Sequence, residues 1–459
     1  MEHMEREWTQ DKTQQYLASY ARALTYEDLP PEVVHAAKVR VVDTLGCVIG
    51  GFFGAPCRIA RSIALRHSGT ELATVIGTST KSSVEMAAFA NAATARYLDY
   101  NDVGLCHPSD MLTPVLAVAE SAHASGQDLI VAIVLAYEVF MSVTTAIDQP
   151  PPGDKGWDYL TWEPLGVGLG AGKIWGLSEE QMKHCISLAI VPNNALGQNR
   201  QRELSMWKGA GAGQAGKAGV FAAMLAREGM EGPYLPFEGD SGFFKAMGGG
   251  DLISRGPMGG KDIPFKLLSS TSIKRYPCRG GNLSSIAAAL KVHPSLKNME
   301  DIEQVTVYMR DPEPHNTDPE HRPEIWHPKT RETADHSVPY TTTVALMDGT
   351  IGAASYVEGR WHDPELLALV QKVRFATEPS FTQRYQCRVE VITKDGKRHV
   401  GEAKSLEDCY LATDEEIEEK FVGQTQEVLG KKRAEDILAT LWRLEEMPDV
   451  APVPTAFTA

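Results

Sequence analysis

The stretch SMWKGAGAGQAGKAGVF, residues 205–221, contains GAGQAG, which matches the G-x-G-x-x-G fingerprint of dinucleotide-binding proteins. In those proteins the fingerprint follows a strand and opens a helix, because its glycines let a pyrophosphate approach the helix N-terminus. Here the preceding QNRQRELSMWK is polar and does not resemble a strand, whereas the following KAGVFAAMLAREG has helical spacing. The run is therefore interpreted as a close contact between helices and not as a dinucleotide site. A nicotinamide-dependent oxidoreductase, which would depend on that site, is disfavoured.

The rest of the chain predicts a mainly α fold with one inserted α+β part. Residues from about 13 to 270 are mostly helical in their apolar spacing, and a second glycine run, GVGLGAG at 166–172, has helical sequence on both sides. IEQVTVYMR and VQKVRFAT then indicate strands, and CRVEVITKDGKRHVGEAK indicates a hairpin turning at Asp395-Gly396. We expect a helical domain at 1–268, to which 412–459 return, and a smaller α+β domain at 269–411.

Composition excludes several classes of partner. A chain of 459 residues with 43% hydrophobic content suits about two or three domains. The formal charge of −15 argues against binding to nucleic acid or to anionic membranes, so an anionic ligand would need a local group of cations. Apolar stretches such as VVDTLGCVIGGFFG are too short to span a bilayer.

Cysteine and histidine spacing predicts neither disulfides nor a metal site. No C-x-x-C or H-x-x-x-H pair occurs, and the cysteines are odd in number. The charged N-terminus, MEHMEREWTQDKTQQ, lacks the apolar segment of a signal peptide, so we expect a reducing cytoplasm. The seven cysteines are Cys47, Cys57, Cys106, Cys185, Cys278, Cys387 and Cys409.

The segment LDYNDVGLCHPSD gathers acidic side chains and a histidine within nine residues. It holds Asp99, Asn101, Asp102 and His107, the last just before an expected helix start. A carboxylate and an imidazole held together can act as base and acid. Alternatively, Asp102 and Ser109 cap helices and His107 lies on the surface.

Three further motifs offer cations and hydroxyls. In SMWKG the aromatic neighbour can desolvate Lys208 and the small neighbours leave room for a ligand carboxylate, although such a lysine is often just exposed. IKRYPCRGGN supplies Lys274 and Arg279, or is an ordinary basic loop. TADHSVPY supplies Ser337 and Tyr340 before a helical run, together with a histidine (His336) of a kind that is more often structural than catalytic.

Taken in order, LDYND…HPSD, SMWKGAGAGQAGKAG, IKRYPC and TADHSVPY followed by ALMDG resemble the motifs of the MmgE/PrpD family. That family includes 2-methylcitrate dehydratase, cis-aconitate decarboxylase and iminodisuccinate epimerase. The resemblance extends from about residue 10 to 445. It implies a large all-helical domain made of both chain ends, a smaller α+β lid domain, a cofactor-free site at their junction and a homodimer.

The resemblance also implies site residues. Its motifs place five catalytic positions, at Asp99, His107, Lys208, Lys274 and Tyr340. We expect substrate contacts from Asn101, Asp102, Tyr159, Arg279 and Ser337. Three positions depart from the decarboxylase branch: Val103 replaces a threonine, WDYLTW leaves Tyr159 where that branch has a histidine, and Arg279 replaces another histidine. These losses put decarboxylation of cis-aconitate in doubt.

The sequence and the resemblance therefore predict a cofactor-independent lyase acting on a small polycarboxylate, with a hydro-lyase of the 2-methylcitrate dehydratase type as the leading expectation. The expected roles are carboxylate binding by Lys208, Lys274 and Arg279, proton transfer by His107 and Asp99, and hydrogen-bond donation by Tyr340. An epimerase or isomerase needs the same α-proton abstraction and is the alternative, with a decarboxylase third.

Overall fold

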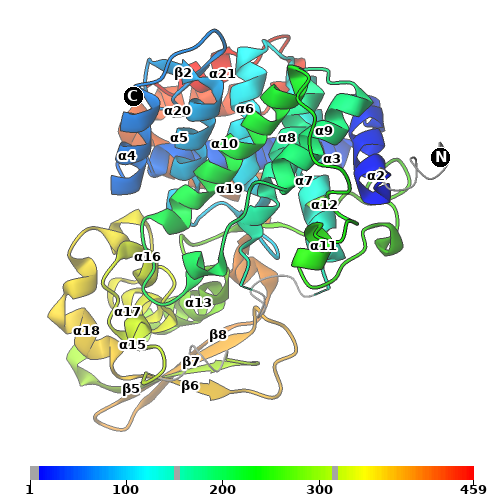
Figure 1. Ribbon diagram of the computed structural model, residues 1–459. Coiled ribbons are helices and arrows are strands. Elements are labelled where there is room, and N and C mark those ends of the chain that lie inside the picture. Colours follow the sequence, from blue (N-terminus) through cyan, green and yellow to red (C-terminus); the bar gives the residue numbers. More distant parts are fainter. Residues whose placement is uncertain (1–9, 149–155, 313–318, 459) are drawn as a thin grey trace.

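The computed structural model describes residues 10–148, 156–312 and 319–458, so the first nine residues of the charged N-terminal stretch lie outside it. Figure 1 shows a larger helical lobe, which carries the two chain ends, and a smaller lobe built on a four-stranded sheet. The fold is mainly α, as predicted.

The helical lobe is built from amphipathic and fully apolar helices. Side-chain caps fix several starts: Ser125 caps α7, Ser178 caps α9 and Thr413 caps α19, each in a reciprocal capping box. The main helices are α2 (Lys12–Ala23), α3 (Pro31–Gly50), α4 (Ala55–Ala64), α5 (Val84–Tyr97), α6 (Leu112–Ser121), α7 (Gly126–Ala146), α8 (Glu163–Ile174), α9 (Glu179–Ile190), α10 (Trp207–Arg227), α11 (Phe243–Ala246), α12 (Lys266–Ser269), α19 (Asp414–Leu429), α20 (Lys431–Leu441) and α21 (Pro452–Ala456).

Both glycine runs lie inside helices, as predicted. GAGQAG belongs to α10 and GVGLGAG to α8, which pack on each other, and α10 also packs on α5. A Cβ at Gly213 would lie 2.4 Å from the carbonyl oxygen of Phe89, and one at Gly219 would lie 2.5 Å from that of Pro164. The glycines therefore let helix backbones approach closely, and among the described residues no strand leads directly into either run as a dinucleotide site requires.

The central helix α7 is both long and strongly apolar. At 21 residues it is long enough to cross a membrane, which corrects the view that every apolar stretch is too short. However, 94% of its most apolar window is buried against the rest of the protein. Such burial is typical of the core helix of a helical lobe.

The smaller lobe contains the predicted strands. Its sheet has the order β6-β5-β7-β8, with β5 (Ile302–Met309) parallel to β6 (Val373–Thr377) and antiparallel to β7 (Cys387–Thr393), which pairs with β8 (Arg398–Ala403). The β7–β8 hairpin turns at Asp395-Gly396, where Gly396 has a φ of +79°. Two longer helices, α13 (Leu283–Val292) and α17 (Val338–Asp348), pack together, and α13 covers β7 and β8 (Figure 1). Shorter ones are α15 (Pro323–Trp326), α16 (Arg331–Ala334) and α18 (Pro364–Val370).

Small strands connect the two lobes. β3 (Asp102–Val103), β4 (Ser272–Lys274) and β9 (Tyr410–Leu411) form an antiparallel sheet in the order β3-β4-β9. A further pair, β1 (Leu72–Thr74) and β2 (Lys81–Ser83), lies within the helical lobe. This lobe was expected to be all-helical, and the strand pair corrects that expectation. The hydrophobic core of the helical lobe includes Ile273, and that of the sheet lobe includes Cys278. Whether 268/269 and 411/412 divide independent domains stays a prediction.

Candidate active site

Asp99 lies at the centre of a buried charged cluster between the two lobes. It follows the last turn of α5 in the left-handed region, with a φ of 51°, a conformation that aspartate tolerates better than most residues. Its side chain is only 1% exposed. The strained turn ends the helix and keeps the carboxylate inside the protein.

Three cations from three elements converge on this carboxylate. Arg96 of α5 donates to Oδ1 over 2.5 Å, and Lys208, the second residue of α10, donates to Oδ2 over 2.8 Å. Lys274 of β4 donates to Oδ1 and, over 3.0 Å, to the Asp99 carbonyl oxygen. Burial alone would raise the pKa of Asp99, but these cations hold it well below its usual range. Asp99 therefore stays ionised, which argues against its expected part in proton transfer.

Two histidines approach the two oxygens of Asp99. The Nε2 atom of His107 lies 3.9 Å from Oδ1, and that of His336 lies 3.8 Å from Oδ2. Burial, together with the charges of Arg96 and Lys274, lowers the pKa of His107 well below its ordinary value. Burial and the charge of Lys208 lower the pKa of His336 to about 4. Both imidazoles are therefore neutral near pH 7 and can accept a proton.

Lys208 is poised differently from the histidines. Its side chain is 2% exposed, and burial lowers its pKa to about 8 although Asp335 and Asp99 oppose the shift. It is thus a cation near neutral pH that can give up a proton at modest cost.

Several expected substrate contacts border the cluster. The hydroxyl of Tyr159 donates to Asp110 over 3.1 Å, and its ring centroid lies 6.0 Å from that of His107. The backbone N–H of Arg279 donates to the carbonyl oxygen of Asp335 over 3.0 Å. Asn101 is fully buried, and no described residue forms a hydrogen bond with its side-chain amide.

Asp102 has a structural role, although His107 and not Asp102 or Ser109 is the N-cap of the following 3-10 turn. Its carboxylate accepts hydrogen bonds from the Ser109 N–H over 3.1 Å and from the Tyr137 hydroxyl over 2.9 Å. It thereby fixes the turn that follows His107. The expectation that His107 lies on the surface is wrong, because its side chain is 12% exposed.

Tyr340 and Ser337 are not brought into the cluster. Tyr340 is fully buried in the hydrophobic core of the sheet lobe, where its hydroxyl donates to the Ser355 carbonyl oxygen over 2.7 Å. Ser337 caps α17 by accepting from the Tyr340 N–H and donates to the Ile325 carbonyl oxygen. The expected roles in substrate contact are corrected accordingly, because the first turn of α17 directs Tyr340 into that core.

Two comparisons with known proteins show which family this sequence belongs to. The MmgE/PrpD N-terminal domain matches residues 15–255, and the MmgE/PrpD C-terminal domain matches residues 276–446. The chain belongs to the MmgE/PrpD family. Human cis-aconitate decarboxylase is 25% identical over 95% of this chain and 93% of its own. The 2-methylcitrate dehydratase of Escherichia coli strain K12 is 24% identical over 79% of this chain and 77% of its own. These identities are too similar to choose between the two activities.

Several site residues of this family member were not expected from the sequence. Arg96 lies one helical turn before Asp99, and Asp335, next to His336, has its other oxygen held by Arg331 at 2.9 Å. Arg96 and Asp99 are three residues apart, and Arg331 and Asp335 are four apart. These are the spacings of salt bridges within a helical turn, so both ion pairs had a signal in the sequence. The Asp-His pair within TADHSVPY was another.

Within the described part of the chain, Asp99, Asp335 and His336 form one group with ligand atoms close enough for a metal ion. Each of these groups already has a partner: Asp99 holds three cations, Asp335 holds Arg331, and His336 is bonded to Asp335. A divalent cation would have to displace buried positive charge, so this donor set does not favour one.

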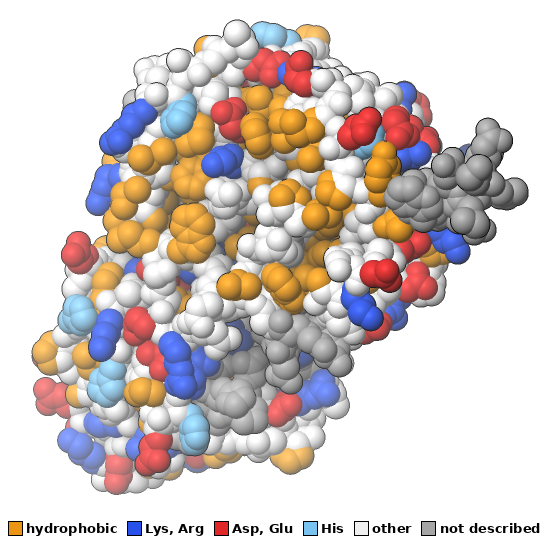
Figure 2. All heavy atoms as spheres, in the orientation of Figure 1, with side chains coloured by type: hydrophobic (Ala, Val, Ile, Leu, Met, Phe, Trp, Pro, Cys, Tyr) orange, Lys and Arg blue, Asp and Glu red, His pale blue; other side chains and the backbone are white. Residues whose placement is uncertain are grey.

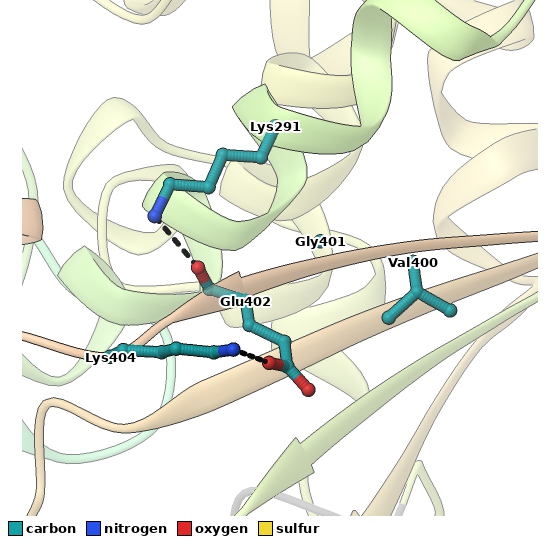
Figure 3. A pocket seen from close by; sticks show the side chains of 5 residues that line it. All are labelled: Lys291, Val400, Gly401, Glu402 and Lys404. Carbon is teal, nitrogen blue, oxygen red and sulfur yellow. Dashed lines mark hydrogen bonds and ion pairs between the residues drawn. The ribbon is translucent and has the colours of Figure 1, made fainter.

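A surface hollow on the sheet lobe differs in chemistry from the cluster. Figure 3 shows it lined by α13 and β8, with Glu402 between two lysines. The backbone carbonyl of Glu402 accepts from Lys291 over 2.8 Å, and its carboxylate pairs with Lys404 at 2.6 Å. Both lysines of the hollow are already paired with Glu402 and are not set up to bind an anionic ligand. The buried cluster around Asp99 is therefore the candidate active site.

Proposed function

We propose that this chain is a hydro-lyase that removes water from a small polycarboxylate of the 2-methylcitrate type, without a cofactor. The observation that carries the proposal is the convergence of Arg96, Lys208 and Lys274 on one buried carboxylate. In a chain of net charge −15, such a local group of cations suits a polyanionic ligand. The dehydratases among the relatives support the reaction type.

The cluster offers each group that dehydration needs. A substrate carboxylate can replace Asp99 as the partner of Lys208 or Lys274, with Arg279 nearby. A neutral imidazole can take the proton α to a carboxylate, and the Lys208 ammonium can protonate the departing hydroxyl. His107 is too weakly basic to be the expected acid at neutral pH, because burial and the neighbouring cations lower its pKa well below its ordinary value.

Epimerisation is the second candidate. A neutral imidazole near Asp99 could take a proton from a substrate carbon, the Lys208 ammonium could deliver one to the opposite face, and the imidazolium could then reprotonate the Lys208 amine. Decarboxylation has less support: Val103 offers no proton donor, and the Tyr159 hydroxyl is already bonded to Asp110.

A panel of di- and tricarboxylates tests the proposal. Ultraviolet absorbance detects a new conjugated double bond, and mass spectrometry of the product distinguishes loss of water from loss of carbon dioxide. We expect loss of water, unchanged by a chelator or by added nicotinamide cofactor. A product of unchanged mass and inverted configuration would support the epimerase instead, and the absence of any reaction would overturn both.

We also propose a homodimer. Figure 2 shows hydrophobic side chains gathered over the face of the helical lobe that carries α10. Trp207 and Phe221 of α10 are each 49% exposed, and Ile59 of the neighbouring α4 is 57% exposed. A second copy of the chain, as the family resemblance implies, would cover this patch.

The cytoplasmic location also stays a proposal. It is supported by seven buried, unpaired cysteines and can be tested by cell fractionation.

A further inference from the structure

His336 is held in one orientation by a carboxylate. The side chain lies between α16 and α17, and its Nδ1 atom is hydrogen-bonded to Oδ1 of Asp335. Asp335 is fully buried, and its Oδ2 atom accepts from Arg331 over 2.9 Å. Burial would raise the pKa of Asp335, but Lys208, His336 and Arg331 lower it overall, so it is ionised and can only accept. Nδ1 therefore carries the proton, and Nε2 presents a lone pair.

His107 has the same tautomer but a weaker partner. Its Nδ1 atom lies 2.9 Å from the carbonyl oxygen of Asp102, which can only accept, so its Nε2 atom also carries a lone pair. The difference appears when a proton arrives at Nε2. A carboxylate beside Nδ1 stabilises the imidazolium that forms, whereas a neutral carbonyl does so less. His336 is therefore the stronger base of the two.

Resting on the proposed function, we infer that His336 is the base that removes the substrate proton, and that Asp335 is its positioning residue. Nε2 of His336 forms a bond to the proton α to a carboxylate, and the electron pair of the broken C–H bond becomes the new C=C bond. The C–O bond breaks, and the hydroxyl takes a proton from the Lys208 ammonium and leaves as water. The His336 imidazolium then returns a proton to the Lys208 amine, so both groups are restored.

The Lys208 ammonium is close enough to take this part. Its Nζ atom lies 2.8 Å from Asp99 Oδ2, and the Nε2 atom of His336 lies 3.8 Å from the same oxygen. Base and acid thus flank one carboxylate oxygen, which is the position that a substrate carboxylate would share or take over. His107, on the other oxygen, is left to accept a hydrogen bond from the substrate.

The test compares His336→Gln, Asp335→Asn and Asp335→Glu with the parent protein, and uses exposed His123→Gln as the control. We expect His336→Gln to lower kcat by about 10² to 10⁴ while KM changes less than about threefold. Exchange of the substrate's α-hydrogen in D₂O should fall in parallel. Asp335→Asn should lower kcat and move the acidic limb of the kcat–pH profile to lower pH, because the imidazolium loses its partner, and Asp335→Glu should partly restore both.

Circular dichroism and substrate titration show whether each variant is folded and binds. His336→Gln that binds substrate and retains the parent kcat would overturn the base assignment while leaving the proposed function in place. An unmoved pH profile in Asp335→Asn would overturn the positioning role. If the parent itself transforms no carboxylate in the panel, the proposed function fails, and this inference fails with it.

Discussion

Lys208 is the residue whose charge depends most on its surroundings. Burial lowers its pKa to about 8, so the free enzyme loses this cation as the pH rises through that value. A bound carboxylate favours the ammonium, and binding therefore takes up a proton above that pH. We expect the Kd of the best panel compound to rise between about pH 8 and 10 by up to about tenfold per pH unit.

The matched variant for this prediction is Lys208→Arg, whose guanidinium stays charged across the range. Its Kd should lack the step near pH 8, whatever its absolute value, in calorimetric titrations of both proteins. A parent Kd that is flat from about pH 7 to 10 would show that Lys208 does not hold the substrate as a cation.

Asp99 should matter for stability as well as for activity. Asp99→Asn leaves Arg96, Lys208 and Lys274 buried without their shared counter-charge. Breaking a buried charge pair typically costs about 3 to 5 kcal/mol of unfolding free energy. Urea unfolding should show a clear loss, whereas Asp240→Asn, at an exposed position, should behave like the parent. Equal midpoints for the three proteins would contradict the central place given to Asp99.

At this scale the sequence predicted part of the cluster. Asp99, His107, Lys208 and Lys274 were all expected and do meet, because each lies within or beside a short motif at an element end. Tyr340 was expected and lies elsewhere, because a motif gives spacing along the chain but not the side of a helix that faces the site.

Helix α10 carries the glycine run, and its glycines are not equivalent. A Cβ at Gly213 would lie 2.4 Å from a backbone oxygen of α5, whereas one at Gly209 would have no neighbour closer than 3.7 Å. Gly213→Ala should therefore lower the unfolding free energy by about 1 to 3 kcal/mol. Gly209→Ala should leave it unchanged or raise it by up to about 1 kcal/mol, because alanine favours the helix.

Thermal and urea unfolding of the two alanine variants provide the comparison. If Gly213→Ala is as stable as Gly209→Ala, the close contact between α10 and α5 is not what the run provides. Retention of stability together with binding of a nicotinamide cofactor would revive the dinucleotide interpretation.

Longer elements were predictable and the shortest were not. Helices such as α2 and strands such as β7 extend over enough residues for a period of 3.6 or 2 to appear. The connecting strands β3, β4 and β9 have two or three residues each, too few for any period. Yet β4 carries Lys274, so the pairing that brings the two lobes' residues together could not be read from hydrophobic spacing.

For the molecule as a whole, the apolar face over α10 predicts self-association. Phe221→Glu would place a charge within that face, so light scattering at micromolar concentration should change from about twice the chain mass toward the chain mass. Val400→Glu is the matched control, since Val400 is 40% exposed on β8 of the sheet lobe. A parent protein that is monomeric, or a Val400→Glu variant that dissociates equally, would contradict this assignment.

The most direct measurement follows binding and product together, with the best tricarboxylate of the panel and a chelator present. Parent protein, Lys274→Met and the control Lys291→Met are compared by calorimetric titration and by product mass. Loss of one charged hydrogen bond to a carboxylate costs about 1.5 to 3 kcal/mol, so Lys274→Met should weaken binding by about ten- to a hundredfold. Lys291 is 48% exposed on the sheet lobe, and its variant should match the parent. The account predicts a product that has lost water, and weaker binding in Lys274→Met alone. Loss of carbon dioxide, or equal affinity in all three proteins, would contradict it.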